Sequence, residues 1–239
     1  MNIIIEKLKL LNYYNEHTND LIMYDSINDI IKFHANVNND NISKLINIIE
    51  SYSLYSRHYT VYLNIKSYGG NIDSLDTFIQ KTKNIEIRAI IETNTTNAGL
   101  LLGLLCNYKY VHKSAEFYIS QFNNNWNGYV QNIKYFNDKN LHTNIEIINY
   151  ILNYIKYKNI FTKDKSKSKL YNLLYNSDKK YHILSAKKLL KMGLINEILH
   201  FDFDLINKQK SKKSIIYENL NEDEHEHAQN ILNKRKLII

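Results

Sequence analysis

The sequence predicts an α/β fold built on a parallel sheet, and three observations within residues 59–121 predict it. Residues 60–65 alternate apolar and polar side chains, as a half-buried strand does, and lead into Gly69 and Gly70. A helix-like stretch at 71–83 is followed by an apolar strand at 85–91. Polar residues 93–97 then give way to an apolar helix from Ala98, followed by a short strand within 115–122. Strands that alternate with helices in this way imply parallel pairing through crossover helices.

Flanking segments extend this pattern, so that residues 26–200 are predicted to form one α/β domain. A first strand is expected at 30–33, and a helix at 41–53 has the i, i+3, i+4, i+7 spacing in Ile42, Leu45, Ile46 and Ile49. Ser185 suits the N-cap of a helix to Met192, with Gly193 as its C-cap. Residues 1–25 are a weakly patterned N-terminal segment, and residues 201–239 form a charged C-terminal extension.

A further helix is expected at about 145–158, because apolar residues form a wide stripe there: Ile147, Ile148, Ile151, Leu152 and Ile155. The stripe has two interpretations. It packs against a partner molecule, or it faces the core of the same chain.

Length and composition limit the class of protein. The chain has 239 residues, enough for one such domain with a core and an extension. The longest apolar run, 98–106, is about half of what a membrane span requires. It contains the single cysteine, Cys106, which we expect in the core and which excludes a disulfide within one chain. The absence of proline and the heavy use of Asn, Lys, Ile and Tyr indicate strongly AT-rich coding. That composition favours a plastid or other organelle interior, with the cytoplasm as the alternative.

The net charge of +7 raises the possibility of nucleic-acid binding. The lysines are dispersed except at 163–169 and 208–213, and neither cluster contains an aromatic stacking motif. Solvated surface is the simpler interpretation, so a nucleic-acid partner is not expected. His225, Glu226 and His227 lie in an acidic run without the i, i+4 spacing of helical zinc ligands, and no metal or other cofactor is expected.

Several motifs, in order, resemble the proteolytic subunit of the Clp protease, within the wider ClpP/crotonase superfamily. The family's Ser-Pro-Gly-Gly corresponds to Ser67-Tyr68-Gly69-Gly70, and its Ala-Ser-Met-Gly-Ala to residues 95–99, Thr-Thr-Asn-Ala-Gly. Its Met-Ile-His-Gln-Pro corresponds to residues 118–122, and its Leu-Ser-Ala and Gly-Leu-Ile to residues 184–186 and 193–195. The resemblance covers residues 26–200. It implies repeated β-β-α units around a parallel sheet, with a protruding handle at about 123–160 that consists of a strand and a long helix.

The departures from the family pattern fall on its catalytic triad. Thr96 stands at the serine position, Ser120 at the histidine position (Gln121 if the match shifts by one), and Ser177 near the aspartate position. A threonine hydroxyl is a poor nucleophile without an imidazole to take its proton. The chain therefore resembles the non-catalytic paralogues called ClpR. By resemblance it belongs to a serine endopeptidase family, but we expect it to be a pseudo-protease.

The resemblance also implies partners and a binding geometry. It implies a hetero-oligomeric double heptameric ring with an active ClpP paralogue, served by an AAA+ Clp ATPase. Residues 1–25 would form the axial loop or docking segment. Tyr62 stands where the family has a tyrosine in the ATPase-docking pocket, and Asn64 replaces a second tyrosine. The backbone amides of Gly70 and Asn97 stand where the family has its oxyanion hole.

Simpler or different interpretations stay open. Gly69 and Gly70 could form a plain turn, and residues 95–97 could only cap the following helix. The chain could be an active serine- or threonine-type peptidase that uses an unrecognised base, although His182 and His112 stand outside the catalytic pattern. It could also be a crotonase-type acyl-CoA enzyme, or a structural or RNA-associated protein.

Overall fold

The computed structural model describes residues 2–55, 60–120, 146, 148–155, 170–172 and 182–200. These residues belong almost entirely to one compact unit, residues 1–199. The predictions for Ser177, for 163–169, for 201–239 and for most of the handle at 123–160 lie outside the described residues.

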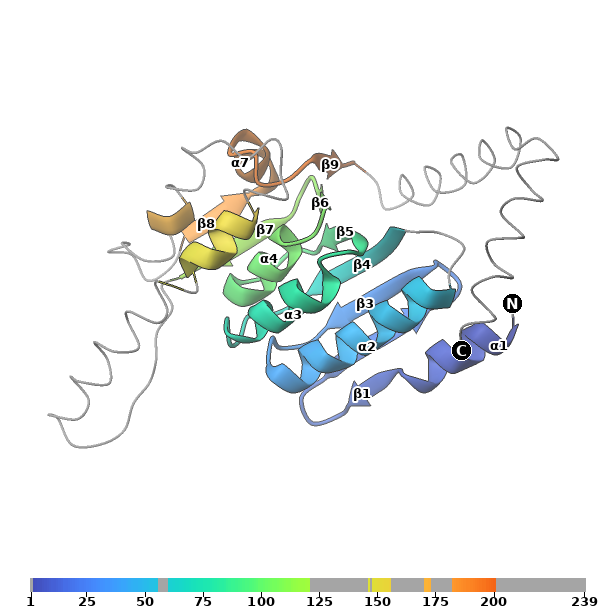
Figure 1. The fold of residues 1–239 in the computed structure, drawn as a ribbon. Coiled ribbons are helices and arrows are strands. Elements are labelled where there is room, and N and C mark those ends of the chain that lie inside the picture. The colour runs from blue at the N-terminus through green and yellow to red at the C-terminus, as the bar shows by residue number, and fades with distance from the viewer. Residues whose placement is uncertain are drawn as a thin grey trace, which may run out of the picture. The chain divides into compact units, whose positions relative to one another are not determined.

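A seven-stranded sheet in the order β1-β2-β3-β4-β5-β6-β9 forms the centre of the unit (Figure 1). Pairing is antiparallel from β1 to β3 and parallel from β3 to β9. The chain is therefore an α/β protein with a mostly parallel central sheet. The strands are β1 (Tyr13–Asn15), β2 (Asp20–Asp25), β3 (Ile30–His34), β4 (Thr60–Lys66), β5 (Glu86–Ile91), β6 (Tyr108–His112) and β9 (Glu197–Leu199).

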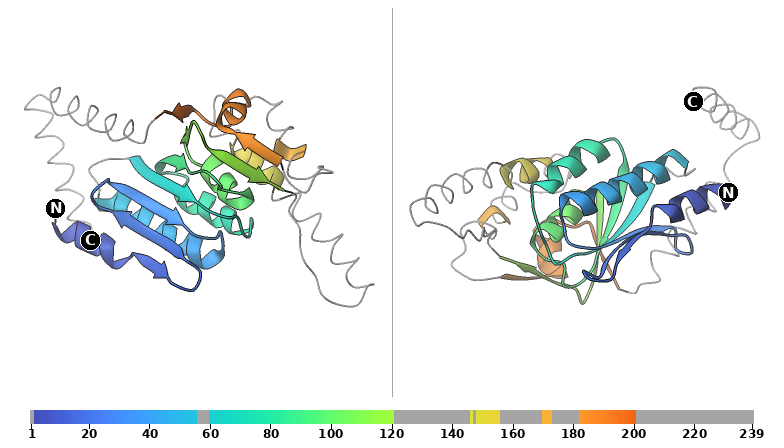
Figure 2. Two further views of the ribbon diagram at one scale, coloured as in Figure 1. Left: turned by 180° about the vertical axis from the view of Figure 1, so that it is seen from behind. Right: turned by 90° about the horizontal axis from the view of Figure 1, so that it is seen from below.

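Three helices lie side by side on one face of this sheet (Figures 1 and 2). They are α2 (Asn39–Tyr55), α3 (Ser74–Thr82) and α4 (Asn97–Leu104). The α4 helix packs closely on the sheet because two of its residues have no side chain. A Cβ on Gly99 would lie 2.5 Å from Cβ of Ser67, and one on Gly103 would lie 2.5 Å from Cδ1 of Ile91.

Alternate residues of each central strand point into the helix-covered core. In β4 these are Val61, Leu63 and Ile65, each at most 1% exposed. Phe33 on β3 and Leu45 on α2 are fully buried, and Cys106 lies in the same core. The opposite face of β2 to β5 is seen from behind in Figure 2, and no helix of the described residues crosses it there. Its side chains, such as Tyr62 and Arg88, are half-buried.

The turn between β2 and β3 is held by carboxylates. The Asp25 carboxylate accepts hydrogen bonds from the backbone N–H groups of Ile27 and Asn28 and forms a 2.7 Å ion pair with Lys32. Asp29, in the left-handed region at φ +58°, accepts hydrogen bonds from the hydroxyls of two tyrosines, Tyr24 at 2.7 Å and Tyr52 at 2.9 Å. These bonds fix the hairpin to the end of α2.

A smaller two-stranded antiparallel sheet, β7 (Glu116–Ile119) with β8 (His182–Ser185), leads into α7 (Ala186–Lys191). The predicted N-cap of α7 is confirmed, whereas the C-cap residue is Met192 and the predicted Gly193 is the residue after it. The Ser185 hydroxyl accepts a hydrogen bond from the backbone N–H of Lys188, and Gly193 follows the helix at φ +70°. The N–H of Leu194 donates back to the carbonyl of Leu189 at 3.0 Å.

The predicted strands at 30–33, 60–65 and 85–91 and the helices at 41–53, 71–83 and from Ala98 are confirmed, with shifts of a few residues at their ends. Two regions differ from expectation. Residues 2–25 hold α1 (Asn2–Leu10), β1 and β2, and Leu8, Ile22 and Tyr24 are buried in the shared core. Strand β6 lies where no strand was expected before residue 112.

Of the two interpretations of the apolar stripe in the predicted helix at 145–158, the described residues support the one in which it faces the core of the same chain. Residues 148–155 are helical, and Ile148, Ile151, Leu152 and Ile155 are at most 2% exposed within this one chain. The segment lies beside α3, since Gln80 donates a hydrogen bond to the hydroxyl of Tyr150 at 3.0 Å. For this part of the predicted handle, the apolar face needs no partner molecule to bury it.

Candidate functional site

The glycine turn after β4 has a conformation that only glycine adopts readily. Gly69 has φ +101° and Gly70 φ +134°. A Cβ on Gly70 would lie 2.1 Å from the carbonyl oxygen of Val37, so a side chain cannot fit there. Two hydrogen bonds of 2.8 Å hold the turn to the residues after β3: Val37 N–H donates to the Gly69 carbonyl, and Asn71 N–H to the Val37 carbonyl.

The start of α4 lies against this turn. Thr96 N–H donates to the carbonyl of Ser67 at 2.9 Å, and a Cβ on Gly69 would lie 3.2 Å from Oγ1 of Thr96. Thr95 is buried, and its hydroxyl lies 3.3 Å from the carbonyl of Ile65. Thr96 is the N-cap residue of α4, but its side chain makes no capping hydrogen bond. The capping interpretation of residues 95–97 therefore holds for the position of Thr96 and not for its hydroxyl.

Asn97 faces Ser120 across this corner. The Asn97 side-chain N–H donates to Oγ of Ser120 at 2.7 Å, and Asn97 Oδ1 accepts the backbone N–H of Ser120 at 2.8 Å. The start of α4 and the end of β7 are also joined by a parallel bridge between Thr96 and Tyr118. These two hydrogen bonds and the bridge hold the start of α4 to the end of β7.

The structure thus brings together most of the sequence-predicted site: Gly70, Thr96, Asn97 and Ser120. In the described part of the chain, the backbone N–H of Gly70 donates to no other protein group, because the bonds to Val37 are made by Gly69 and Asn71. Ser177, the third triad-equivalent position, lies outside the described residues.

No imidazole or carboxylate of the described residues is hydrogen-bonded to Thr96, Asn97 or Ser120. His182 comes nearest in register because it pairs with Ile119 in the small sheet. Side chains alternate along a strand, so His182 shares the face of Ile119, and Ser120 comes on the other face. The described part of the corner therefore holds backbone donors and neutral side chains but no general base.

Tyr62, the predicted ATPase-docking residue, alternates along β4 with the buried Val61 and Leu63 and therefore points to the opposite face of the sheet. The Arg88 guanidinium lies 5.9 Å from the ring centroids of both Tyr62 and Tyr108 and donates two hydrogen bonds to Glu86. Burial raises the pKa of the neighbouring Tyr110 hydroxyl to about 12, with the Tyr62 hydroxyl contributing and Arg88 opposing. Tyr62 is thus part of an aromatic and cationic surface.

A polar chain on the same face was not found from the sequence. His34 Nε2 lies 2.6 Å from Asn64 Oδ1, and the Asn64 side-chain N–H donates to Glu92 at 2.7 Å. Because the Asn64 oxygen accepts, His34 carries its proton on Nε2. His34 and Asn64 are 30 positions apart along the chain, and Asn64 and Glu92 are 28 positions apart. Only the register of β3, β4 and β5 brings them together, so spacing in the sequence gave no signal.

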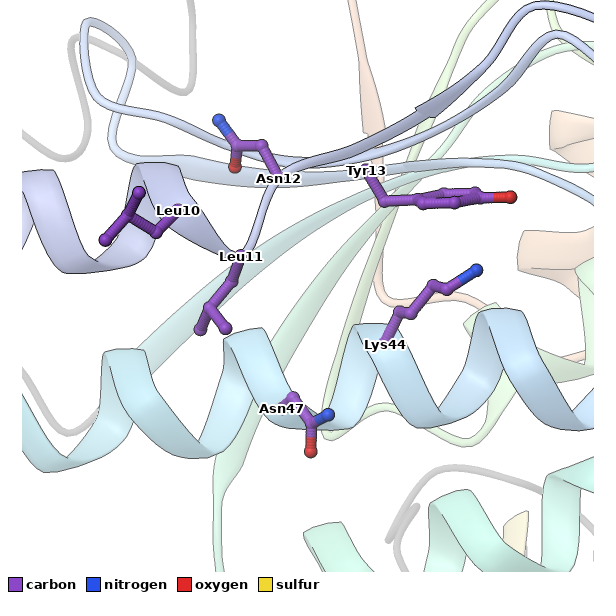
Figure 3. Close-up of a pocket in the computed structure, with 6 residues that line it drawn as sticks. All are labelled: Leu10, Leu11, Asn12, Tyr13, Lys44 and Asn47. Atoms are coloured by element: carbon purple, nitrogen blue, oxygen red, sulfur yellow. The ribbon is translucent and has the colours of Figure 1, made fainter.

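A hollow of about 230 Å³ lies between the end of α1, β1 and α2 (Figure 3). Its lining includes Leu10, Leu11, Asn12 and Asn47, together with Lys44, whose Nζ lies 3.3 Å from the centroid of the Tyr13 ring. Figure 3 shows the Tyr13 ring and the Lys44 side chain facing each other. The lining provides a cation and two amides but no nucleophile with a base, so it is a weaker candidate for chemistry.

The described residues contain no group of three His, Cys, Asp or Glu side chains that could hold a metal ion. Within the same residues, no helix has the length and apolar character needed to cross a membrane. His225, Glu226 and His227 lie outside them.

The sequence matches no model of a known protein family, and no curated protein is significantly similar to it. The functional assignment therefore depends on the fold and on the residues of this corner.

Proposed function

We propose that the chain is a ClpR-like subunit of an ATP-dependent Clp protease complex, with a structural or regulatory role and no catalysis of its own. One observation carries the proposal. The glycine turn, the start of α4 and the end of β7 form a corner, yet no base of the described residues is hydrogen-bonded to Thr96, and Ser120, at the histidine position, is hydrogen-bonded to Asn97.

The support comes in two steps. A glycine turn after a parallel strand, set against the start of a buried helix, is an arrangement that can direct backbone N–H groups at a carbonyl oxygen. Such donors alone do not cleave a peptide, because acyl transfer also needs an activated nucleophile. Thr96 has its hydroxyl beside Gly69 and no base bonded to it within the described residues. A retained framework without its reactive groups is what a pseudo-enzyme subunit would have.

The proposal includes partners and a location. The subunit would co-assemble with an active ClpP paralogue in a double heptameric ring and meet an AAA+ ATPase. Tyr62 and its neighbour Arg88 would contribute to the docking surface. Asn64 is engaged by His34 and Glu92 instead of offering a second tyrosine, so we expect weakened docking on this subunit. From composition, we propose a plastid or other organelle interior.

A fluorophosphonate probe, which reacts with activated serine and threonine hydroxyls, tests the absence of catalysis. We expect the purified chain to remain unlabelled under conditions in which an intact serine peptidase, used as the control, is fully labelled. Labelling at Thr96 would contradict the proposal and favour an active peptidase.

The other two rivals give different results with the same preparation. Saturable binding of acyl-CoA would favour a crotonase-type enzyme. RNA binding that weakens steeply with salt would favour a nucleic-acid role.

A further inference from the structure

The chain turns sharply at Thr96 and Asn97, where an extended segment enters α4. We call this turn the elbow, because a turn of this kind presents one side chain. Thr96 is extended, at φ −122° and ψ +156°, and the next residue, Asn97, lies in the left-handed region at φ +35° as the first residue of the helix. Two residues later Gly99 is obligatory, because a Cβ there would lie 2.8 Å from Oγ of Ser67. A sharp strand-to-helix turn with its central residue exposed at the top of the sheet is the device that presents a nucleophile in α/β hydrolases.

Thr96 and Asn97 have different surroundings in this elbow. The Thr96 backbone bonds to Ser67 and bridges to Tyr118, and its hydroxyl lies on the side of Gly69. The Asn97 side chain instead crosses to position 120, and its amide nitrogen ends 2.7 Å from Oγ of Ser120. The separation of the two side chains at positions 97 and 120 is that of a hydrogen-bonded nucleophile and base.

We infer that Asn97, and not Thr96, stands at the position from which this turn would present a nucleophile. The side-chain amide of Asn97, hydrogen-bonded to Ser120, takes the place of the nucleophile and its base. The inference rests on the proposed function, since it identifies which residue took the place of the nucleophile. The present pair has a long side chain at 97 and a short one at 120. A serine at 97 and a histidine at 120 would reverse the two lengths and span roughly the same gap.

The reverse substitution gives a defined reaction. In the N97S/S120H variant, the new hydroxyl oxygen would attack the phosphorus of a fluorophosphonate probe. The imidazole at 120 would take the hydroxyl proton, the P–F bond would break, and fluoride would leave. The backbone N–H of Gly70, which the described protein groups leave unused, is available to the phosphoryl oxygen.

The experiment compares N97S/S120H with two matched controls, using the rate of labelling and mass-spectrometric identification of the labelled residue. T96S/S120H makes equivalent changes one residue away, and N97A/S120H lacks the hydroxyl. We expect labelling of N97S/S120H at position 97, about 100-fold faster than in either control, which is the lower range of a general-base contribution. Equal or faster labelling of T96S/S120H overturns the inference, as does no labelling of a folded N97S/S120H.

Single cysteine variants keep the inference testable if the double variant does not fold. The thiol of N97C would need no added base and would lie at a helix start, which favours the thiolate. The native Cys106 is buried and gives a low background. We expect iodoacetamide to alkylate N97C at least about tenfold faster than T96C, and the opposite order would overturn the assignment.

The inference and the proposed function fail separately. Labelling of the unmodified chain would contradict the inactive-subunit proposal whatever the variants do. A chain that never enters a protease ring would remove the ring role while leaving the position of the elbow at Asn97 intact.

Discussion

Replacing Gly70 by alanine tests whether the glycine turn is held as rigidly as the structure requires. The added Cβ would lie 2.1 Å from the Val37 carbonyl oxygen and 2.9 Å from the Val37 backbone nitrogen. These are backbone atoms, so they cannot move aside by rotating a side chain. The residue would also have to adopt φ +134° or force the turn to change.

Three contributions set the magnitude. Backbone strain at a positive φ costs about 1–3 kcal/mol. Overpacking costs a further ~1–3 kcal/mol. Disturbing the hydrogen bonds between Val37 and the turn removes about 1 kcal/mol each. We therefore expect G70A to lower the free energy of unfolding by roughly 4–8 kcal/mol, a large part of the ~5–15 kcal/mol typical of a domain.

Gly69→Ala is the matched control. It lies in the same turn at φ +101°, but its Cβ would meet Oγ1 of Thr96 at 3.2 Å, a contact that a small movement relieves. We expect it to cost about 1–3 kcal/mol. Urea unfolding followed by circular dichroism measures both. If G70A were within about 0.5 kcal/mol of G69A, the close approach of the turn to Val37 would be wrong.

Three further outcomes are expected. Burial opposes ionisation of Asp25, but hydrogen bonds from Lys32 and Asn28 outweigh it and lower the pKa from 3.8 to about 2. The ionised carboxylate therefore stabilises the fold fully above about pH 4, and this stabilisation is lost as the pH falls through about 2. D25N should cost about 1–2 kcal/mol at pH 7 and much less below pH 2; a pH-independent difference in urea unfolding would count against this. Phe33→Ala should cost about 3–5 kcal/mol because the ring is fully buried, and a loss below about 1 kcal/mol would contradict the core assignment. Cys106, 1% exposed, should react with the thiol reagent DTNB only on unfolding, and rapid reaction of the native chain would refute its burial.

Much of the sheet could be predicted because its strands and helices carry regular patterns. The alternation of Val61, Leu63 and Ile65 and the helical spacing after Asn41 each place one face in the core, and both predictions are confirmed. Strand β6 was missed for a physical reason. Its sequence, YKYVH, buries Lys109, the second residue of the strand, at 0% exposure, so the expected alternation is hidden by a charged residue.

The N-terminal region was missed for a different reason. Among residues 5–25, few apolar side chains are buried, among them Leu8 and Ile22, and the strands gain their order from antiparallel pairing of β1 with β2 and of β2 with β3. Such pairing depends on the rest of the sheet and leaves only a weak local pattern.

The residues of the site could be predicted from the sequence, but the contacts between their side chains could not. Gly70, Thr96, Asn97 and Ser120 were singled out and do come together. The pairing of Asn97 with Ser120 joins residues 23 apart. It depends on the left-handed backbone at Asn97, which no spacing rule reveals. The chain from His34 through Asn64 to Glu92 likewise requires the sheet register.

The central claim is that this chain is an inactive member of a protease ring, and its native partners test that claim most directly. The measurement is isolation of the chain at its natural abundance, followed by native mass and identification of the proteins that co-purify. The account predicts a particle of about 400 kDa, the mass of fourteen chains of this size, containing a Clp subunit with an intact Ser-His-Asp set. Recovery as a monomer or as a homo-oligomer without such a partner would contradict it.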